Sequence, residues 1–193
     1  MFFDMTIQTR LAGHLSPPGA VAAFWAPLGH ATWFGKDPAF DRRFRESFPL
    51  QHGAAARGEL MPWLTTPEGA LSLVLLLDQY PRNAFRGMPR MYDTDNLARI
   101  VANVALELGH DQSVAPDLRV FFYLPFGHSE HLPDQERAVT LCAALPEPAP
   151  SHAKGHRDII ARFGRFPHRN AVLGRASTAE ESAWLDDDGE RFG

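Results

Sequence analysis

Apolar residues recur along this chain mostly at intervals of three and four. Stripes with this spacing begin, in chain order, at Phe40, Leu97, Leu118, Ala138 and Ile159. On an α-helix, side chains three and four positions apart lie on one face, so each stripe predicts a helix with one buried face. Strict alternation of apolar and polar residues, which would indicate strands, is rare in this chain. The hydrophobic pattern therefore predicts a chain that is nearly all helix.

Signals for helix starts precede several stripes. A capping side chain stands directly before a proline three times, at Ser16, Asp37 and Thr66. Such side chains accept hydrogen bonds from the first turn, and the fixed φ of proline suits that turn. Ser177 and Glu180 have the spacing of a capping box, which predicts a last helix around Trp184.

Signals for helix ends are equally regular. Gly109 and Gly164 follow their stripes at the position where a left-handed residue ends a helix. Pro49 interrupts the stripe of phenylalanines and is expected to kink or end that helix. Because the connections are short, neighbouring helices are expected to run antiparallel, as stacked helical hairpins.

The chain length favours one domain. A chain of 193 residues with 45% hydrophobic residues is long enough for one well-buried core. We expect a single helical domain over residues 16–186, between a flexible N-terminal segment, 1–15, and a flexible C-terminal tail, 187–193. The proline-rich stretch from Pro146 to Pro150 is too short to separate two domains.

Charge and cysteine content exclude several classes of function. The net charge of −4 gives no basic surface for nucleic acid. The longest apolar run, from Leu71 to Leu77, is well short of the ~20 residues of a membrane-spanning helix. The N-terminus lacks the features of a secretory signal. With a single cysteine, Cys142, which falls on an apolar stripe as a packed thiol, a cytoplasmic protein is expected.

Several polar residues fall on faces that the stripes turn inward. Asp78 lies on the face of Leu71 and Val74, and Asp134, Gln135 and His156 stand in the same relation to later stripes. A buried carboxylate without a partner costs several kcal/mol, so Asp78 is expected to have an arginine partner.

Two segments contain a similar pattern of an aromatic residue, proline, and then arginine and asparagine. They are LDQYPRNAFRG, from Leu77 to Gly87, and RFGRFPHRNAVLGR, from Arg162 to Arg175. In both, an apolar helical run is expected to end at a corner. Arginine and asparagine carry planar groups with several hydrogen-bonding atoms, which fix geometry when they are paired.

Two interpretations of these corners remain open. In the structural one, which we favour, buried carboxylates hold the arginines and the asparagines satisfy backbone groups. The polar network then consists of Asp78, Gln79, Asp134, Gln135, His156, Asp158 and Arg162. In the functional one, free arginines clamp a carboxylate or a phosphate. The ligand-binding candidates are Arg82, Asn83, Arg86, Arg165, His168, Arg169 and Asn170.

Histidines near carboxylates suggest metal binding, but their spacing argues against it. His156 and Asp158 are expected on a helix, where two residues two positions apart point in different directions. Asp158 pairs more simply with Arg162, four residues on. His128 and Glu130 are expected in a loop. No recognised ligand motif is present, so we expect no metal and no cofactor.

His128 and His168 are the candidates for general acid or base catalysis, because a histidine pKa lies near working pH. The sequence shows no serine elbow, no phosphate-binding glycine loop and no dinucleotide fingerprint. An enzyme of this kind would act on a negatively charged small substrate that arginines position.

Three segments, LLLDQYPRNAFRG, VFFYLPFGHSEHLPDQERAV and HRDIIARFGRFPHRNAVLGRASTAEE, give the chain a specific resemblance. It resembles a bacterial family known as domain of unknown function 924, from about Val21 to about Leu185. The resemblance implies a tetratricopeptide-like, right-handed stack of antiparallel helices. It marks the polar residues of the two corners, and those around His128 and His156, as characteristic of the family. It implies no activity.

Three functions are therefore compared. The leading one is a cytoplasmic helical-repeat module that binds a small anionic molecule or a short peptide in a polar groove through Arg82, Arg165 and Arg169. The second is the acid/base enzyme described above. The third is a scaffold for protein interactions, for which a two-fold packed homodimer would be one arrangement.

Overall fold

The structure is a computed structural model that describes residues 15–187, and these residues form helices and no strand, as predicted. The α-helices are α1 (Ala20–Trp25), α2 (His30–Trp33), α3 (Pro38–Ser47), α4 (Pro49–Ala56), α5 (Pro67–Val74), α6 (Tyr80–Ala84), α7 (Asp95–Glu107), α8 (Val120–Gly127), α9 (Leu132–Cys142), α10 (Ala149–Phe163) and α11 (Ala179–Asp187). The expected flexible ends, 1–15 and 187–193, lie outside the described residues except for Leu15 and Asp187. The right-handed hairpin stack stays a prediction.

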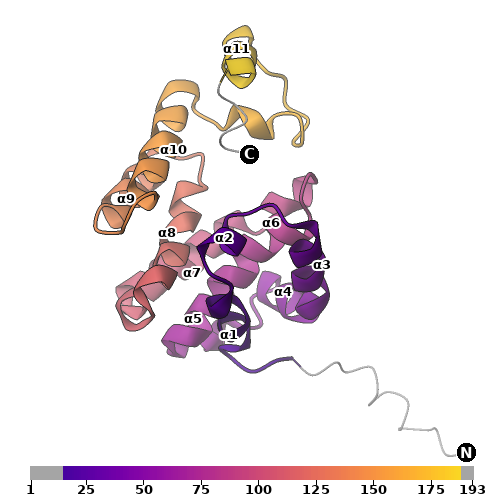
Figure 1. The fold of residues 1–193 in the computed structure, drawn as a ribbon, viewed down its shortest axis with the longest axis vertical. Coiled ribbons are helices and arrows are strands. Elements are labelled where there is room, and N and C mark those ends of the chain that lie inside the picture. The colour runs from indigo at the N-terminus through magenta and orange to yellow at the C-terminus, as the bar shows by residue number, and fades with distance from the viewer. Residues whose placement is uncertain (1–14, 188–193) are drawn as a thin grey trace, which may run out of the picture.

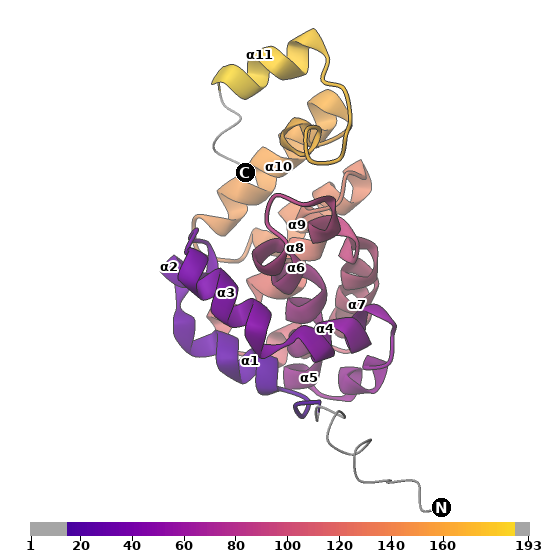
Figure 2. The same cartoon turned by 90° about the vertical axis from the view of Figure 1, so that its right-hand side faces the viewer.

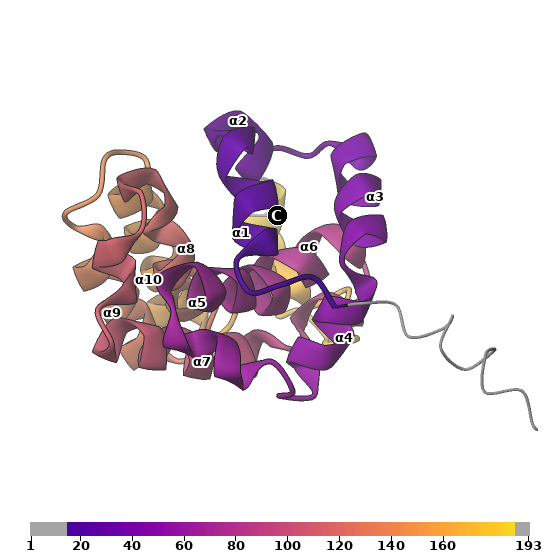
Figure 3. The ribbon, with the colours of Figure 1, turned by 90° about the horizontal axis from the view of Figure 1, so that it is seen from below.

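The helices are arranged around α5 and α6. Helix α3 packs against α6, α7 packs against α5 and α8, and α9 packs against both α8 and α10. Figure 3 shows α3 and α4 on one side of α5 and α6, with α8 to α10 on the other. Helix α10 leads away from this body to α11 at one end of the molecule (Figures 1 and 2).

The core of the described residues is rich in aromatic side chains. The rings of Trp25 and Phe44 lie 5.1 Å apart, and Trp25 meets Phe121 edge-on at 5.5 Å. Phe40 and Phe44, which share the predicted stripe, are both buried. Such aromatic packing joins α1, α3 and α8 through large buried surfaces. Within residues 15–187 we find no helix with both the length and the apolar surface that a membrane crossing needs.

Two of the three predicted proline-adjacent caps are confirmed. Asp37 accepts a hydrogen bond from the amide of Ala39, and Thr66 accepts one from the amide of Gly69. The prediction for Ser16 was wrong, because α1 begins only at Ala20. The Ser16 hydroxyl instead accepts a hydrogen bond from the Gln51 side chain.

The predicted capping box of the last helix is displaced by one residue. The Thr178 hydroxyl accepts from the amide of Glu181, and the Glu181 carboxylate accepts from the amide of Thr178. The prediction of Ser177 and Glu180 was therefore wrong in register. Both pairs have the same spacing, so the sequence pattern alone does not separate them.

The predicted helix ends are confirmed. Gly164 ends α10 with a φ of 70°, and Gly109 follows the end of α7 with a φ of 71°. Both values lie in the left-handed region that favours glycine. Pro49 separates two helices, because α3 ends at Ser47 and α4 begins at Pro49.

The sequence indicates a corner at the first aromatic-proline segment. The structure instead shows a continuous helix there. Helix α5 continues through a π-helical turn, Leu75–Gln79, directly into α6, which carries Pro81. Proline has no amide hydrogen, so an α-helix would leave the carbonyl four residues earlier, that of Leu77, without its donor. The Thr94 hydroxyl donates to that carbonyl. The chain thus stays helical where proline was expected to end the helix.

The π-helical turn releases a second carbonyl. The amide of Tyr80 donates to Leu75, five residues back, which leaves the carbonyl of Leu76 without its usual helical donor. Nδ1 of His52, on α4, lies 2.9 Å from that oxygen and donates to it. Side chains from α4 and from the start of α7 therefore complete the hydrogen bonding of the central helix.

We predict that Thr94→Val lowers the free energy of unfolding by about 1–3 kcal/mol, because it leaves the buried Leu77 carbonyl without a donor. Urea denaturation measures the change. The control is Thr140→Val, which removes a hydroxyl that also donates to a helix carbonyl, but in an exposed position. We expect this control to change stability by less than ~0.5 kcal/mol. Equal losses in both variants would contradict this role of Thr94.

Candidate functional site

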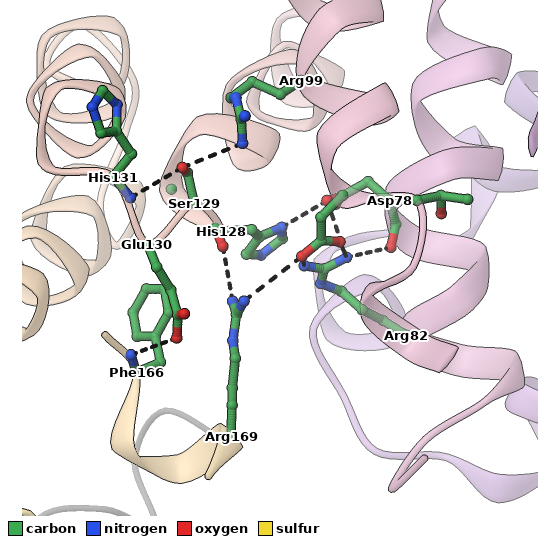
Figure 4. Close-up of polar contacts among 12 residues, drawn as sticks. Asp78, Arg82, Arg99, His128, Ser129, Glu130, His131, Phe166 and Arg169 are labelled. Carbon is green, nitrogen blue, oxygen red and sulfur yellow. Dashed lines mark hydrogen bonds and ion pairs between the residues drawn. The ribbon is translucent and has the colours of Figure 1, made fainter. Parts of the chain in front are cut away.

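A buried carboxylate, Asp78, lies at the centre of the polar cluster in Figure 4. Its Oδ1 atom accepts a hydrogen bond from Nδ1 of His128 at 2.8 Å and lies 3.1 Å from Nη1 of Arg82. Its Oδ2 atom accepts one from the Gln79 side chain at 2.7 Å. The arginine partner expected for Asp78 is therefore Arg82, four residues on, and a histidine from the loop after α8 shares the carboxylate.

A second carboxylate, Asp95 at the start of α7, binds the same arginine. Both terminal nitrogens of Arg82 donate to Asp95, at 2.7 and 2.9 Å. Arg169 lies on the other side, with its Nη1 atom 3.7 Å from Asp95 and its Nη2 donating to the carbonyl of His128 at 2.9 Å (Figure 4). The guanidinium of Arg169 also lies over the rings of Tyr92 and Phe166.

These pairs decide the charge state of the centre. Burial alone raises the pKa of Asp78, but the positive charge of Arg82 and the hydrogen bond from His128 outweigh burial and lower that pKa to about 2. Burial lowers the pKa of Arg82, while the charges of Asp78 and Asp95 raise it above its ordinary value. Asp78 and Arg82 are therefore both charged at neutral pH, as a buried pair needs to be.

His128 is held in one neutral tautomer. Burial, followed by the charge of Arg82, lowers the pKa of His128, against the opposing effect of Asp78. Because a carboxylate accepts only, Nδ1 of His128 carries the proton that Asp78 receives. Nε2 is then the unprotonated nitrogen. His128 thus presents a hydrogen-bond acceptor on the side of the ring away from Asp78.

A cleft of about 540 Å³ borders this centre. We use "the cleft" for the cavity lined by α2 and the loop after it, by helix α6 and by helices α8 to α10. Its polar lining includes Lys36, Gln79, Arg82, Asn83, Arg86, Asp117, His128, Glu147, His152 and His156. Its apolar lining includes Trp33, Phe34, Val120, Leu124 and Leu145. The cleft therefore combines one group of hydrogen-bonding side chains with an apolar wall.

Two further candidates from the first segment lie at the cleft but also have protein partners. Arg86 forms two hydrogen bonds to Asp41 on α3, at 2.8 and 3.0 Å. Asn83 donates to the carbonyl of Gln79 at 2.8 Å, so it satisfies a backbone group, as the structural interpretation expects. The first segment thus both braces the helices and lines the cleft.

The candidates of the second segment lie away from the cleft. Arg165 donates twice to Glu181 and also to the carbonyl of Ala176. Asn170 binds side chains, donating to Ser177 and accepting from Arg175, whereas a backbone partner was expected. Neither these residues nor Arg169 lines the cleft. The two segments are therefore similar in sequence and different in position.

The loop after α8 is tied to the second segment through Glu130. Its carboxylate accepts two hydrogen bonds from Arg175, at 2.7 and 2.9 Å, and one from the amide of Phe166 at 2.8 Å. Figure 4 shows Glu130 and Phe166 beside the loop that carries His128. These contacts, together with Arg169, fix the backbone on both sides of His128.

The arginine partner of Asp134 differs from expectation, whereas Gln135 had no predicted partner. Asp134 lies 3.2 Å from Arg99 of α7 and accepts from the Ser129 hydroxyl, so its arginine does not come from either segment. Gln135 donates to the carbonyls of Gly127 and Ser129. Both residues therefore shape the loop that carries His128.

The expected pair between Asp158 and Arg162 was wrong. Asp158 pairs with the adjacent Arg157 at 2.7 Å, and Arg162 pairs with Glu180 of α11 at 2.9 Å. His156 and Asp158 do share helix α10, as predicted. Among residues 15–187 no group of three histidine, cysteine, aspartate or glutamate side chains is placed to hold a metal ion.

The two candidate catalytic histidines have different surroundings. His128 lines the cleft, whereas His168 does not. Nδ1 of His168 is buried without a hydrogen-bond partner, and burial lowers the pKa of His168 to about 4. His156 lines the cleft, and its Nδ1 donates to the carbonyl of Gly127. His128 has both a carboxylate partner, Asp78, and access to the cleft.

Several residues that matter here carry no recognisable signal in the sequence. Asp95 is the first residue of α7, where an acidic side chain is ordinary, so its contact with Arg82 across 13 residues was not foreseen. Lys36, Trp33 and Phe34 line the cleft from a short segment with no recognisable motif. Only spatial proximity reveals their role.

The fold and the site together define a class: an all-helical protein in which a buried network of ion pairs lies behind a cleft. A family model described as "Bacterial protein of unknown function (DUF924)" matches residues 21–189, so the chain belongs to this family. The structure is similar to that of a protein of unknown function, ATU0120, from Agrobacterium tumefaciens. The two are 52% identical over 86% of this chain and 95% of that one, with a TM-score of 0.85. None of the curated proteins matches this sequence.

We predict that the protein loses stability as pH falls from 7 to 5. Burial lowers the pKa of His52, His128, His156 and His168, to about 3 for His156 and about 4 for His168. The unfolded chain, with a histidine pKa of about 6.5, binds more protons in this range, which favours unfolding. Urea denaturation at several pH values measures the slope.

The variant His156→Gln should give a smaller slope than the natural chain between pH 7 and 5, because one of these buried neutral groups is gone. A free energy of unfolding that does not change over this range would contradict the neutral state of the buried histidines.

Proposed function

We propose that this protein binds a small molecule with an anionic group in the cleft. The observation that carries the proposal is that Lys36, Arg82 and Arg86 all line the cleft, next to a largely apolar wall. Cations of this kind attract and orient a carboxylate or a phosphate. A volume of about 540 Å³ also fits a small organic molecule, because such pockets usually measure ~300–1,000 Å³.

The arginines involved differ from those in the hypothesis from the sequence. Arg165 and Arg169 are bound to other parts of the protein away from the cleft, so we assign them a structural role. Arg82 is also bound to carboxylates, but it lines the cleft while these bonds hold its orientation. A side chain that is already ordered loses little entropy when a ligand binds. We therefore place the anionic group near Arg82 and Arg86.

We predict that monocarboxylates, dicarboxylates or phosphates at millimolar concentration raise the melting temperature, because a ligand that binds only the native state stabilises it. The variants Lys36→Gln and Arg86→Gln should each weaken this binding about three- to tenfold, as expected for the loss of one exposed charge contact of ~0.5–1.5 kcal/mol. Isothermal titration calorimetry measures the dissociation constants.

Two control variants test whether the loss is local. Lys154 is exposed and does not line the cleft, so Lys154→Gln removes the same charge elsewhere. Arg57 is exposed and makes two hydrogen bonds to Glu59, so Arg57→Gln removes a carboxylate pair like that of Arg86. Both controls should bind as the natural chain does. An equal loss in the controls, or no stabilisation by any anion, would overturn the proposal.

A second candidate function, acid/base catalysis, is favoured by one observation. Nδ1 of His128 donates to a buried aspartate while the residue lines the cleft, which is how a general base is oriented. Of the two histidines that the sequence indicated, we retain only His128. His168 lies outside the cleft.

Turnover in a screen of anionic esters and phosphoesters tests this candidate. We expect His128→Asn to lower the rate about 100-fold or more, the usual contribution of a general base. His168→Asn should leave the rate nearly unchanged, since that residue lies away from the cleft. Equal rates in His128→Asn and the natural chain would exclude His128 as the base.

A further inference from the structure

The Asp78 and His128 pair gives the cleft a fixed hydrogen-bond acceptor. Nδ1 of His128 is bonded to Asp78, and among residues 15–187 no group donates a hydrogen bond to Nε2. Nε2 is not one of the fully buried polar atoms that lack a partner, and His128 lines the cleft with its side chain 14% exposed, so Nε2 can be reached from the cleft. Nε2 of His128 is therefore available to a ligand as a hydrogen-bond acceptor.

The cleft that this acceptor borders is lined by three cationic side chains and also by the carboxylates of Asp117 and Glu147. Arg82, Arg86 and Lys36 carry only hydrogen-bond donors. A ligand that meets both kinds of group needs an anionic acceptor for the cations and, close by, a donor for Nε2 of His128. A carboxylate next to a hydroxyl group has both. A simple carboxylate or phosphate has no donor for Nε2 when it is fully ionised.

The apolar wall indicates what the rest of the ligand resembles. Trp33 and Phe34 line the cleft together with Val120 and Leu124. Phe34 is 45% exposed, so one part of its ring is left without protein contact. A planar ring in the ligand can pack against these two aromatic residues with offset or edge-on geometry.

We propose that the ligand of the cleft is an aromatic hydroxy acid. Its carboxylate faces Arg82 and Arg86, its hydroxyl donates to Nε2 of His128, and its ring packs against Trp33 and Phe34. The carboxylate part of this assignment rests on the proposed function. The hydroxyl part is separate, because it depends on the tautomer that Asp78 imposes on His128.

Three probe molecules separate the two parts. They are 3-phenyllactate, which has both groups, 3-phenylpropionate, which lacks the hydroxyl, and 2-hydroxy-3-phenylpropanamide, which lacks the charge. We expect 3-phenyllactate to bind about tenfold more tightly than either of the others, a difference of ~1.4 kcal/mol. Calorimetry with the full chain measures all three dissociation constants.

Two variants locate the hydroxyl contact. In His128→Phe, the tenfold preference for 3-phenyllactate over 3-phenylpropionate should disappear, because no acceptor remains. The matched control is His152→Phe, at a histidine that also lines the cleft and is exposed. It should keep the preference. A preference that persists in His128→Phe, or that is lost equally in His152→Phe, would overturn the assignment to His128.

Nitrogen NMR of the labelled natural chain tests the contact without any change to the fold. Before ligand is added, His128 should show a protonated Nδ1 and an unprotonated Nε2. The Nε2 resonance should move on binding 3-phenyllactate and stay in place with 3-phenylpropionate. A His128 ring protonated on Nε2 would overturn the inference.

The outcomes for the two proposals differ. Equal binding of 3-phenyllactate and 3-phenylpropionate, both tighter than the amide, overturns the hydroxyl contact and supports the anion-binding function. Equal binding of 3-phenyllactate and the amide, both tighter than 3-phenylpropionate, supports the hydroxyl contact and overturns the anion-binding function. No binding of any probe at millimolar concentration overturns the aromatic hydroxy acid as the ligand class.

Discussion

The buried carboxylate of Asp78 is the constraint on which the rest of the structure depends. A charge in the interior is tolerated only when its partners are close and well oriented, because its removal from water costs several kcal/mol. Arg82 supplies the opposite charge and His128 a hydrogen bond. Both terminal nitrogens of Arg82 in turn donate to Asp95. The relative positions of α6, α7 and the loop after α8 are therefore set by one group on the central helix.

The backbone around Asp78 also binds neighbouring helices to the central helix. The π-helical turn and Pro81 together release the carbonyls of Leu76 and Leu77, which accept from His52 and Thr94. Because these donors come from α4 and from the start of α7, the irregular turn is bonded to helices on both sides. A regular α-helix would bond the Leu76 carbonyl to the amide of Tyr80 and leave His52 without this acceptor.

The helical fold could be predicted from local signals, but the polar network could only partly be predicted. Phe40 and Phe44 are buried together, because their spacing of four residues alone places them on the same face of a helix. The same reasoning placed Asp78 on a buried face. It did not find Asp95, because pairing with Arg82 depends on how α7 is placed beside α6. Nor did it predict that the helix continues through Pro81. Proline is expected to end a helix, and the compensating donor, Thr94, is distant in sequence.

The structural and the functional interpretations of the arginine-rich segments apply to different residues. In the second segment Arg165 and Arg169 bind carboxylates, carbonyls and aromatic rings and take no part in the cleft. In the first, Arg82 is equally well paired, yet it lines the cleft beside His128. Internal pairing therefore does not argue against a binding site. Fixed orientation is what a polar group needs if it is to recognise a ligand, since the bonds that hold it in place also remove the entropy that binding would otherwise cost.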